Sequence, residues 1–115
     1  MSDCIFCKIV KGEIPSKKVY ENDQIVAFHD ITPQAPVHLL IIPKKHIPSA
    51  LFIDEEVAQE IMPEVFIAIT KLAKEFNLEE TGFRIVNNCG LDGGQTVDHI
   101  HFHLLGGRKL QWPPG

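Results

Sequence analysis

Residues 97–105 read VDHIHFHLL, a segment in which histidines alternate strictly with apolar residues. Alternation with a period of two is typical of a β-strand that buries one of its faces. We expect Ile100, Phe102 and Leu104 to enter the core, and the three intervening histidines to stand in a row on the other face, roughly 6.5–7 Å apart. Because the chain has only six histidines, this row favours a reactive site over three unrelated structural roles.

The segment just before it, residues 87–96 (NNCGLDGGQT), is rich in glycine, asparagine and aspartate. Glycines let the backbone approach a ligand closely, and successive N–H groups in such a turn bind anions. The same composition is also typical of an ordinary turn between two strands. Next to a row of imidazoles, we interpret the segment as an anion-binding loop.

Length and composition limit the class of protein. The 115 residues suffice for a single domain, 1–115, and their 44% hydrophobic and 23% charged content is typical of a globular chain. The net charge of −4 offers no basic surface for nucleic acid. Neither a signal-peptide pattern nor an apolar run long enough to cross a bilayer is present, so we expect a cytoplasmic protein without a membrane partner. Three cysteines suit free thiols or a metal site better than disulfides.

The remaining patterns predict an α+β fold with an antiparallel sheet of about five strands. Residues 4–11 are expected to form one or two helical turns, and residues 17–20 and 24–28 a β-hairpin. A buried strand follows at residues 37–42. Residues 83–87 form the strand before the glycine-rich loop.

The main helix begins after Asp54, a favourable N-cap, and its apolar positions recur with helical spacing to Phe76. Pro63 interrupts this pattern, so the helix should kink there or begin again. We expect the helix to cover one face of the sheet. Val57, Phe66 and Ile67 lie off its core-facing positions, and a second copy of the chain in a homodimer is the simplest partner for them.

The histidine pattern ends on two hydrophobic residues, giving HIHFHLL over 99–105. Other segments agree with the same family pattern: 5–6 (IF), 27–38 (AFHDITPQAPVH), 42–46 (IPKKH), 92–96 (DGGQT), 105–108 (LGGR) and 112–115 (WPPG). Together they resemble the nucleotide-binding branch of the histidine triad (HIT) family over nearly the whole chain. This resemblance implies a HIT-like fold with a short N-terminal helix and a homodimer. It also implies a purine nucleoside 5′-phosphoramidase that acts through a nucleotidyl-histidine intermediate.

Roles for individual residues follow from the resemblance and from their chemistry. His101, at the centre of the row, is the expected nucleophile, with His99, His103, His38 and Thr96 as the other catalytic groups. Asp30 is expected to bind the ribose hydroxyls, although a turn aspartate before Thr32-Pro33 is the alternative. The residues expected around the nucleotide are Phe6, Ile9, Phe28 and Ile31 at the base, and Asn88, Gly94, Gln95, Thr96, His101 and His103 at the phosphate. The resembled branch places Trp112 near the leaving group in the partner's site, whereas composition alone suggests a loose tail.

Cys4 and Cys7 form a Cys-x-x-Cys pair, which fits buried thiols, a redox pair or half of a zinc site. A thioredoxin-like redox motif would follow a strand, and none precedes this one. Zinc needs two further ligands, and His46 and His99 are the candidates. Some members of the resembled family carry zinc in this arrangement. We therefore expect a structural zinc and no cofactor for catalysis.

Two other functions stay open. One is a related enzyme that hydrolyses dinucleoside polyphosphates or transfers the nucleotidyl group to another acceptor. The other is a non-catalytic adaptor that binds a purine nucleoside monophosphate or its phosphoramidate. The WPPG ending and Thr96 favour the phosphoramidase over the related enzyme, and the presence of His101 argues against the adaptor.

Overall fold

The computed structural model describes residues 3–115, and its centre is a five-stranded antiparallel sheet in the order β1-β2-β3-β5-β4. The strands are β1 (Lys18–Glu21), β2 (Ile25–His29), β3 (Val37–Pro43), β4 (Phe83–Val86) and β5 (Phe102–Gly106). The predicted α+β class and strand number are confirmed. Within residues 3–115, no helix combines the length and apolarity needed to cross a membrane.

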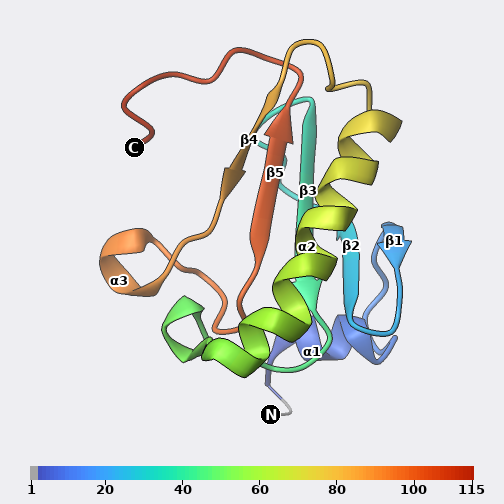
Figure 1. Cartoon of the computed structure of the whole chain (residues 1–115), viewed down its shortest axis with the longest axis vertical. Helices are drawn as coiled ribbons and strands as arrows, with labels where there is room; N and C mark the ends of the chain where they lie inside the picture. The colour runs from blue at the N-terminus through green and yellow to red at the C-terminus, as the bar shows by residue number, and fades with distance from the viewer. Residues whose placement is uncertain (1–2) are drawn as a thin grey trace.

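Helix α2 (Glu55–Glu75) runs across one face of the sheet (Figure 1). Asp54 caps it as predicted, because its Oδ1 accepts a hydrogen bond from the Val57 N–H at 2.9 Å. The restart that we considered at Pro63 does not occur, since a single unbroken helix passes through this residue. Pro63 is exposed, so water can solvate the carbonyl group that its missing N–H leaves free.

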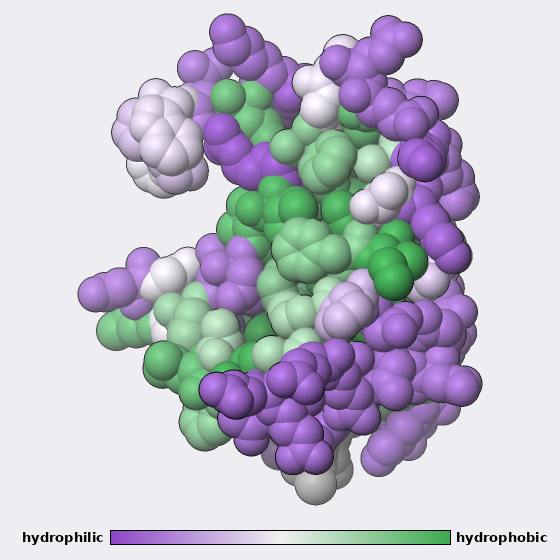
Figure 2. Space-filling view, viewed as in Figure 1, coloured by the Kyte–Doolittle hydropathy of each residue, from purple (hydrophilic) through white to green (hydrophobic). Residues whose placement is uncertain are grey.

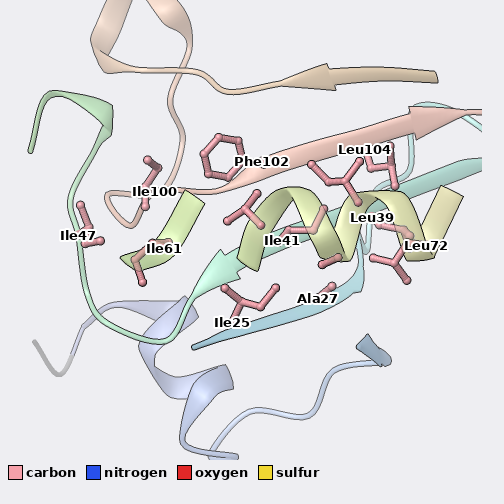
Figure 3. Close-up of a cluster of buried hydrophobic side chains, with 13 residues drawn as sticks. Ile25, Ala27, Leu39, Ile41, Ile47, Ile61, Leu72, Ile100, Phe102 and Leu104 are labelled. Carbon is pink, nitrogen blue, oxygen red and sulfur yellow. The ribbon is translucent and has the colours of Figure 1, made fainter. Parts of the chain in front are cut away.

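The main core fills the space between α2 and the sheet (Figure 3). It contains every second residue of the central strands, including Leu39, Ile41, Phe102 and Leu104. Val57, which we expected to lie away from the core, packs against it instead. Ile100, Phe102 and Leu104 are all buried there, as the alternation predicted.

A second, smaller cluster lies on the opposite face of the sheet. Alternate residues of β2 and β3 meet Phe6 and Ile9 of the short helix α1 (Ile5–Val10). The two helices therefore cover different faces, and the histidines that alternate with the core residues point toward α1. This second face carries the candidate site.

The predicted strand over 97–105 is too long, because β5 begins only at Phe102. The Ile100 N–H donates at 2.7 Å to the carbonyl of Ile47, and not to a neighbouring strand. Ile47 lies in the segment before the 3-10 helix η1 (Ala50–Phe52). His99 and His101 thus lie in irregular backbone ahead of the strand, and a short helix, α3 (Gly90–Gly93), forms within the predicted loop. The imidazole centroids of His101 and His103 are 5.2 Å apart, closer than a straight strand predicts.

Candidate active site

A cavity of about 770 Å³ opens between α1 and the sheet. Its apolar wall comes from α1 and the following segment, from the end of β2 and the residues after it, and from the middle of β3. It includes Phe6, Ile9, Phe28, Ile31 and Leu40. Asp30, Thr96, His101 and His103 supply polar groups to the same cavity. The arrangement can hold a flat apolar ring at one end and an anionic group at the other.

The protonation of His101 is set by its own segment of backbone. Its Nδ1 lies 2.8 Å from the carbonyl oxygen of His99. A carbonyl can only accept, so Nδ1 carries the proton and Nε2 keeps its lone pair. Phe6 of α1 packs edge-on against this ring at a centroid distance of 5.1 Å. His101 is therefore a buried, oriented imidazole whose basic nitrogen is Nε2.

His38 and His103 form a second imidazole pair, whose tautomers follow from one backbone amide. The N–H of Gln34 donates to His38 Nδ1 at 3.0 Å, so the proton of His38 sits on Nε2. That Nε2 lies 2.9 Å from His103 Nδ1, which must accept, and the proton of His103 therefore sits on its own Nε2. This His103 Nε2 is buried and has no hydrogen-bond partner among the described residues. The cavity wall thus contains an N–H donor that awaits an acceptor.

Asp30 adds a carboxylate beside this pair. Its Oδ2 lies 3.4 Å from His38 Nε2, and its Oδ1 accepts from the Thr32 N–H at 2.7 Å. The turn interaction that we considered as an alternative role is therefore present, yet Asp30 also reaches the cavity. One carboxylate is both held by the turn and available to a ligand.

The pKa values of the paired histidines keep them neutral. Burial, and after it the neighbouring His101 and His38, lower the pKa of His103 to about 4, while Asp30 opposes them. Burial also lowers the pKa of His38, again against the effect of Asp30. At neutral pH both rings are uncharged, so the tautomers given above are well defined.

Cys4, Cys7, His46 and His99 come together next to the cavity, with their ligand atoms within 4.8 Å of one another. Individual separations are 3.4 Å for Cys4 Sγ to His99 Nδ1, 3.2 Å for Cys7 Sγ to His46 Nδ1, and 3.3 Å between the two Nδ1 atoms. A zinc tetrahedron with bonds of about 2.0–2.3 Å has edges of roughly 3.3–3.8 Å. The donor set and its dimensions therefore fit Zn²⁺.

The surroundings of His99 support the same assignment. Its Nε2 lies 2.8 Å from the Pro43 carbonyl oxygen, so Nε2 is protonated and Nδ1 presents a lone pair to the thiols. Burial, with a smaller effect from Cys4, raises the pKa of Cys7, and a bound cation would act in the opposite direction. The four protein ligands leave no open position, which is typical of a structural ion. His99 belongs to this cluster and is not on the cavity wall.

Only some of the other predicted site residues line the cavity. Thr96 reaches the cavity, whereas Asn88, Gly94, Gln95 and His38 are not on its wall. The backbone N–H of Gln95 donates to the Gly90 carbonyl. The Gln95 side chain accepts from the Gly90 N–H and donates to the carbonyls of Pro48 and Val97, so this residue stabilises the loop. Trp112 is 81% exposed, in a tail that extends away from the sheet (Figure 1).

Sequence reasoning missed the backbone groups that fix the histidines. The Gln34 N–H and the Pro43 carbonyl set two tautomers, and neither role depends on the identity of a side chain. The hydroxyl of Ser16, on the cavity wall, is also buried without a partner among the described residues. The family pattern includes the segments that contain Gln34 and Pro43, but it does not single out their backbone groups.

Comparisons with known proteins agree with this fold and site. The HIT domain model matches residues 11–110. The chain is 51% identical over 114 residues to a 14 kDa zinc-binding protein from Brassica juncea, covering 98% of this chain and 100% of that one. A HIT family hydrolase from Legionella pneumophila Philadelphia 1 has a TM-score of 0.95 at 51% identity, over 98% of this chain and 100% of that one. A histidine triad nucleotide-binding protein from Candida albicans has a TM-score of 0.79 at 40% identity, over 96% and 83%. The chain belongs to the HIT domain family.

Proposed function

We propose that this protein hydrolyses the P–N bond of purine nucleoside 5′-phosphoramidates through a nucleotidyl intermediate on His101. The observation that carries the proposal is the unprotonated Nε2 of His101, fixed by the His99 carbonyl, in a cavity that also holds the His103 N–H donor. The names of the Legionella hydrolase and the Candida nucleotide-binding protein agree with hydrolysis of a nucleotide.

In the proposed complex the base lies against the apolar wall of Phe6, Ile9, Phe28 and Ile31, and Asp30 accepts hydrogen bonds from the ribose hydroxyls. The α-phosphoryl group then lies between His101 and His103. An apolar wall selects a flat ring and contributes little discrimination between purines.

The first step forms a bond between His101 Nε2 and the α-phosphorus and breaks the P–N bond. The departing amine takes a proton from His103 Nε2 or from the Thr96 hydroxyl, and water returns a proton to that group in the same step, so that neither an imidazolate nor an alkoxide forms. In the second step the hydroxide that remains attacks the phosphorus and breaks its bond to His101 Nε2. This releases the nucleoside monophosphate and restores the His101 imidazole.

The zinc site is proposed to support this chemistry without contacting the substrate, by holding the residues around the cavity in place. The ion would join Cys4 and Cys7 at the start of α1 to His46 and to His99, whose carbonyl orients His101. It would thereby hold Phe6 and Ile9 against the cavity. The zinc-binding name of the Brassica relative agrees with this role.

We also propose a homodimer formed through the face that carries α2 and the edge strand β4. Phe66 and Ile67 of α2 and Phe83 of β4 are 49%, 46% and 42% exposed. Figure 2, which shows the α2 face, has hydrophobic surface across its centre, flanked by hydrophilic residues. In such a dimer the exposed tail with Trp112 would reach toward the partner's site. Sedimentation of Phe66→Glu against the wild type tests the interface, and an unchanged dimer would overturn it.

The activity is tested with adenosine 5′-phosphoramidate and a dinucleoside polyphosphate, using the wild type and His101→Ala. We expect AMP release from the phosphoramidate, with loss of this activity in the variant. Faster hydrolysis of the dinucleotide would identify the rival hydrolase instead. AMP binding without hydrolysis of either compound would identify a nucleotide-binding adaptor.

A further inference from the structure

The turn between β2 and β3, residues 33–36, faces the active site on one side and the end of the chain on the other. On its inner side the Gln34 N–H donates to His38 Nδ1 at 3.0 Å. On its outer side the Gln34 carbonyl accepts two hydrogen bonds from the Arg108 guanidinium, from Nε at 3.1 Å and from Nη2 at 2.9 Å. One residue thus links the imidazole pair to an arginine that does not touch the cavity.

A second contact holds the same turn in place. Gly107 has a φ of +91°, and a Cβ on it would lie 2.8 Å from the Cβ of Pro36. A side chain at this position would therefore push the turn away from the end of β5. The close approach of Gly107 to Pro36 and the two bonds from Arg108 together fix the turn against the segment that follows β5.

The Gln34 amide excludes one tautomer of His38, and the Asp30 carboxylate, 3.4 Å from His38 Nε2, favours the same outcome. An N–H group can only donate, so it excludes the tautomer of His38 that carries its proton on Nδ1. If the amide moved away, His38 could adopt that tautomer and accept at Nε2 from His103 Nδ1. The proton of His103 would then leave Nε2, and the cavity would lose its N–H donor.

We propose that Arg108 is a positioning residue for the reaction, and that it acts through the Gln34 amide to keep the proton of His103 on Nε2. This inference rests on the proposed function, because the His103 N–H is the group that meets the phosphoryl oxygen or the leaving amine. Arg108 itself does not touch the substrate.

The test is a long-range ¹H–¹⁵N NMR spectrum of the imidazole nitrogens in the substrate-free protein. We expect Nε2-protonated rings for both His38 and His103 in the wild type. Arg108→Ala should convert a measurable fraction of both rings to the Nδ1-protonated form. Hydrolysis should show a kcat lowered roughly 10-fold, with little change in KM, because a donor used in the transition state is lost.

Arg84→Ala is the matched control. Arg84 also binds the tail, through Nη2 to the Gln111 carbonyl at 2.9 Å, but does not contact the turn. It should leave both tautomers as in the wild type. Equal effects of the two arginine substitutions on the tautomers, or unchanged tautomers in Arg108→Ala, would overturn the proposal.

A second pair of variants addresses the amide directly. Gln34→Pro removes the N–H, whereas Gln34→Ala keeps it, and only the proline variant should shift the tautomers. If Gln34→Pro does not fold, the Arg108→Ala spectrum decides alone. The spectrum needs no substrate, so it tests the role of Arg108 separately from the activity. If the tautomers follow these predictions but the protein hydrolyses no phosphoramidate, the proposed function is refuted and the effect of Arg108 on the imidazoles is retained.

Discussion

The imidazole Nδ1 of His101 lies 2.8 Å from the backbone carbonyl oxygen of His99, whose own side chain points into the Cys/His cluster. One residue therefore belongs to the candidate metal site through its side chain and to the candidate active site through its backbone. Phe6 contacts both imidazoles edge-on, at 5.8 Å from His99 and 5.1 Å from His101. The two sites are adjacent parts of one structure.

Loss of the proposed zinc ion should loosen α1 without unfolding the sheet. Cys4→Ser is expected to lower the zinc content from one ion per chain and to lower the midpoint of thermal unfolding by several degrees, since about 1 kcal/mol corresponds to roughly 4–8 °C in a domain of this size. KM should rise more than kcat falls, because Phe6 and Ile9 form the cavity wall. Elemental analysis, thermal unfolding and steady-state kinetics measure these effects.

Cys89→Ser is the control for this substitution, because Cys89 is a free cysteine outside the cluster. It should keep the zinc content and the unfolding temperature of the wild type. A Cys4→Ser protein with full zinc content would contradict the assigned ligand set.

Gly107→Ala should destabilise the protein more than Gly12→Ala. Both glycines have positive φ, +91° and +78°, so each substitution carries the cost of that backbone conformation. Only Gly107 adds a clash with Pro36, which we expect to contribute about 1–3 kcal/mol more to the loss of unfolding free energy. Urea unfolding of the two variants measures the difference. Equal losses of unfolding free energy would show that the turn at Pro36 moves aside without destabilising the protein.

Stability should fall as the pH is lowered from about 6.5 toward 4. In the unfolded chain His103 has its usual pKa near 6.5, so it binds a proton in this window. In the folded protein its pKa is about 4, so it does not. The free energy of unfolding therefore rises with pH across the window, and the contribution of His103 to it is complete above about pH 6.5. His38, whose pKa is also lowered, adds to the same trend.

His103→Asn should reduce this slope by up to about 1.4 kcal/mol per pH unit. Urea unfolding between pH 5 and 7, with zinc at saturating concentration, measures it. A slope as steep in His103→Asn as in the wild type would assign the pH dependence to other groups.

Much of the fold follows from local patterns. Alternation at Ile100, Phe102 and Leu104 correctly predicted which face of the segment enters the core, and Asp54 correctly marked the start of the main helix. The start of β5 was not predictable, because Ile100 pairs with Ile47, a contact between distant segments. The restart considered at Pro63 was wrong, because the cost of a proline in a helix depends on exposure, which the sequence does not reveal.

The candidate site was predicted as a set of side chains, and its organisation comes from backbone groups. The resemblance placed Asp30, Thr96, His101 and His103 at one site, and the structure brings them to one cavity. The carbonyls of Pro43 and His99 and the amide of Gln34 fix the histidine tautomers, and their positions depend on tertiary packing. A sequence pattern cannot reveal such groups, because every residue has them.

The most direct test of the account is a rapid-quench reaction of the wild-type protein with adenosine 5′-phosphoramidate, followed by mass spectrometry of its peptides. We predict an adenylyl group on His101, formed before the release of AMP and absent from His101→Ala. Hydrolysis at full rate with no adenylylated peptide, or with the group on another residue, would contradict the assignment of His101 as the nucleophile.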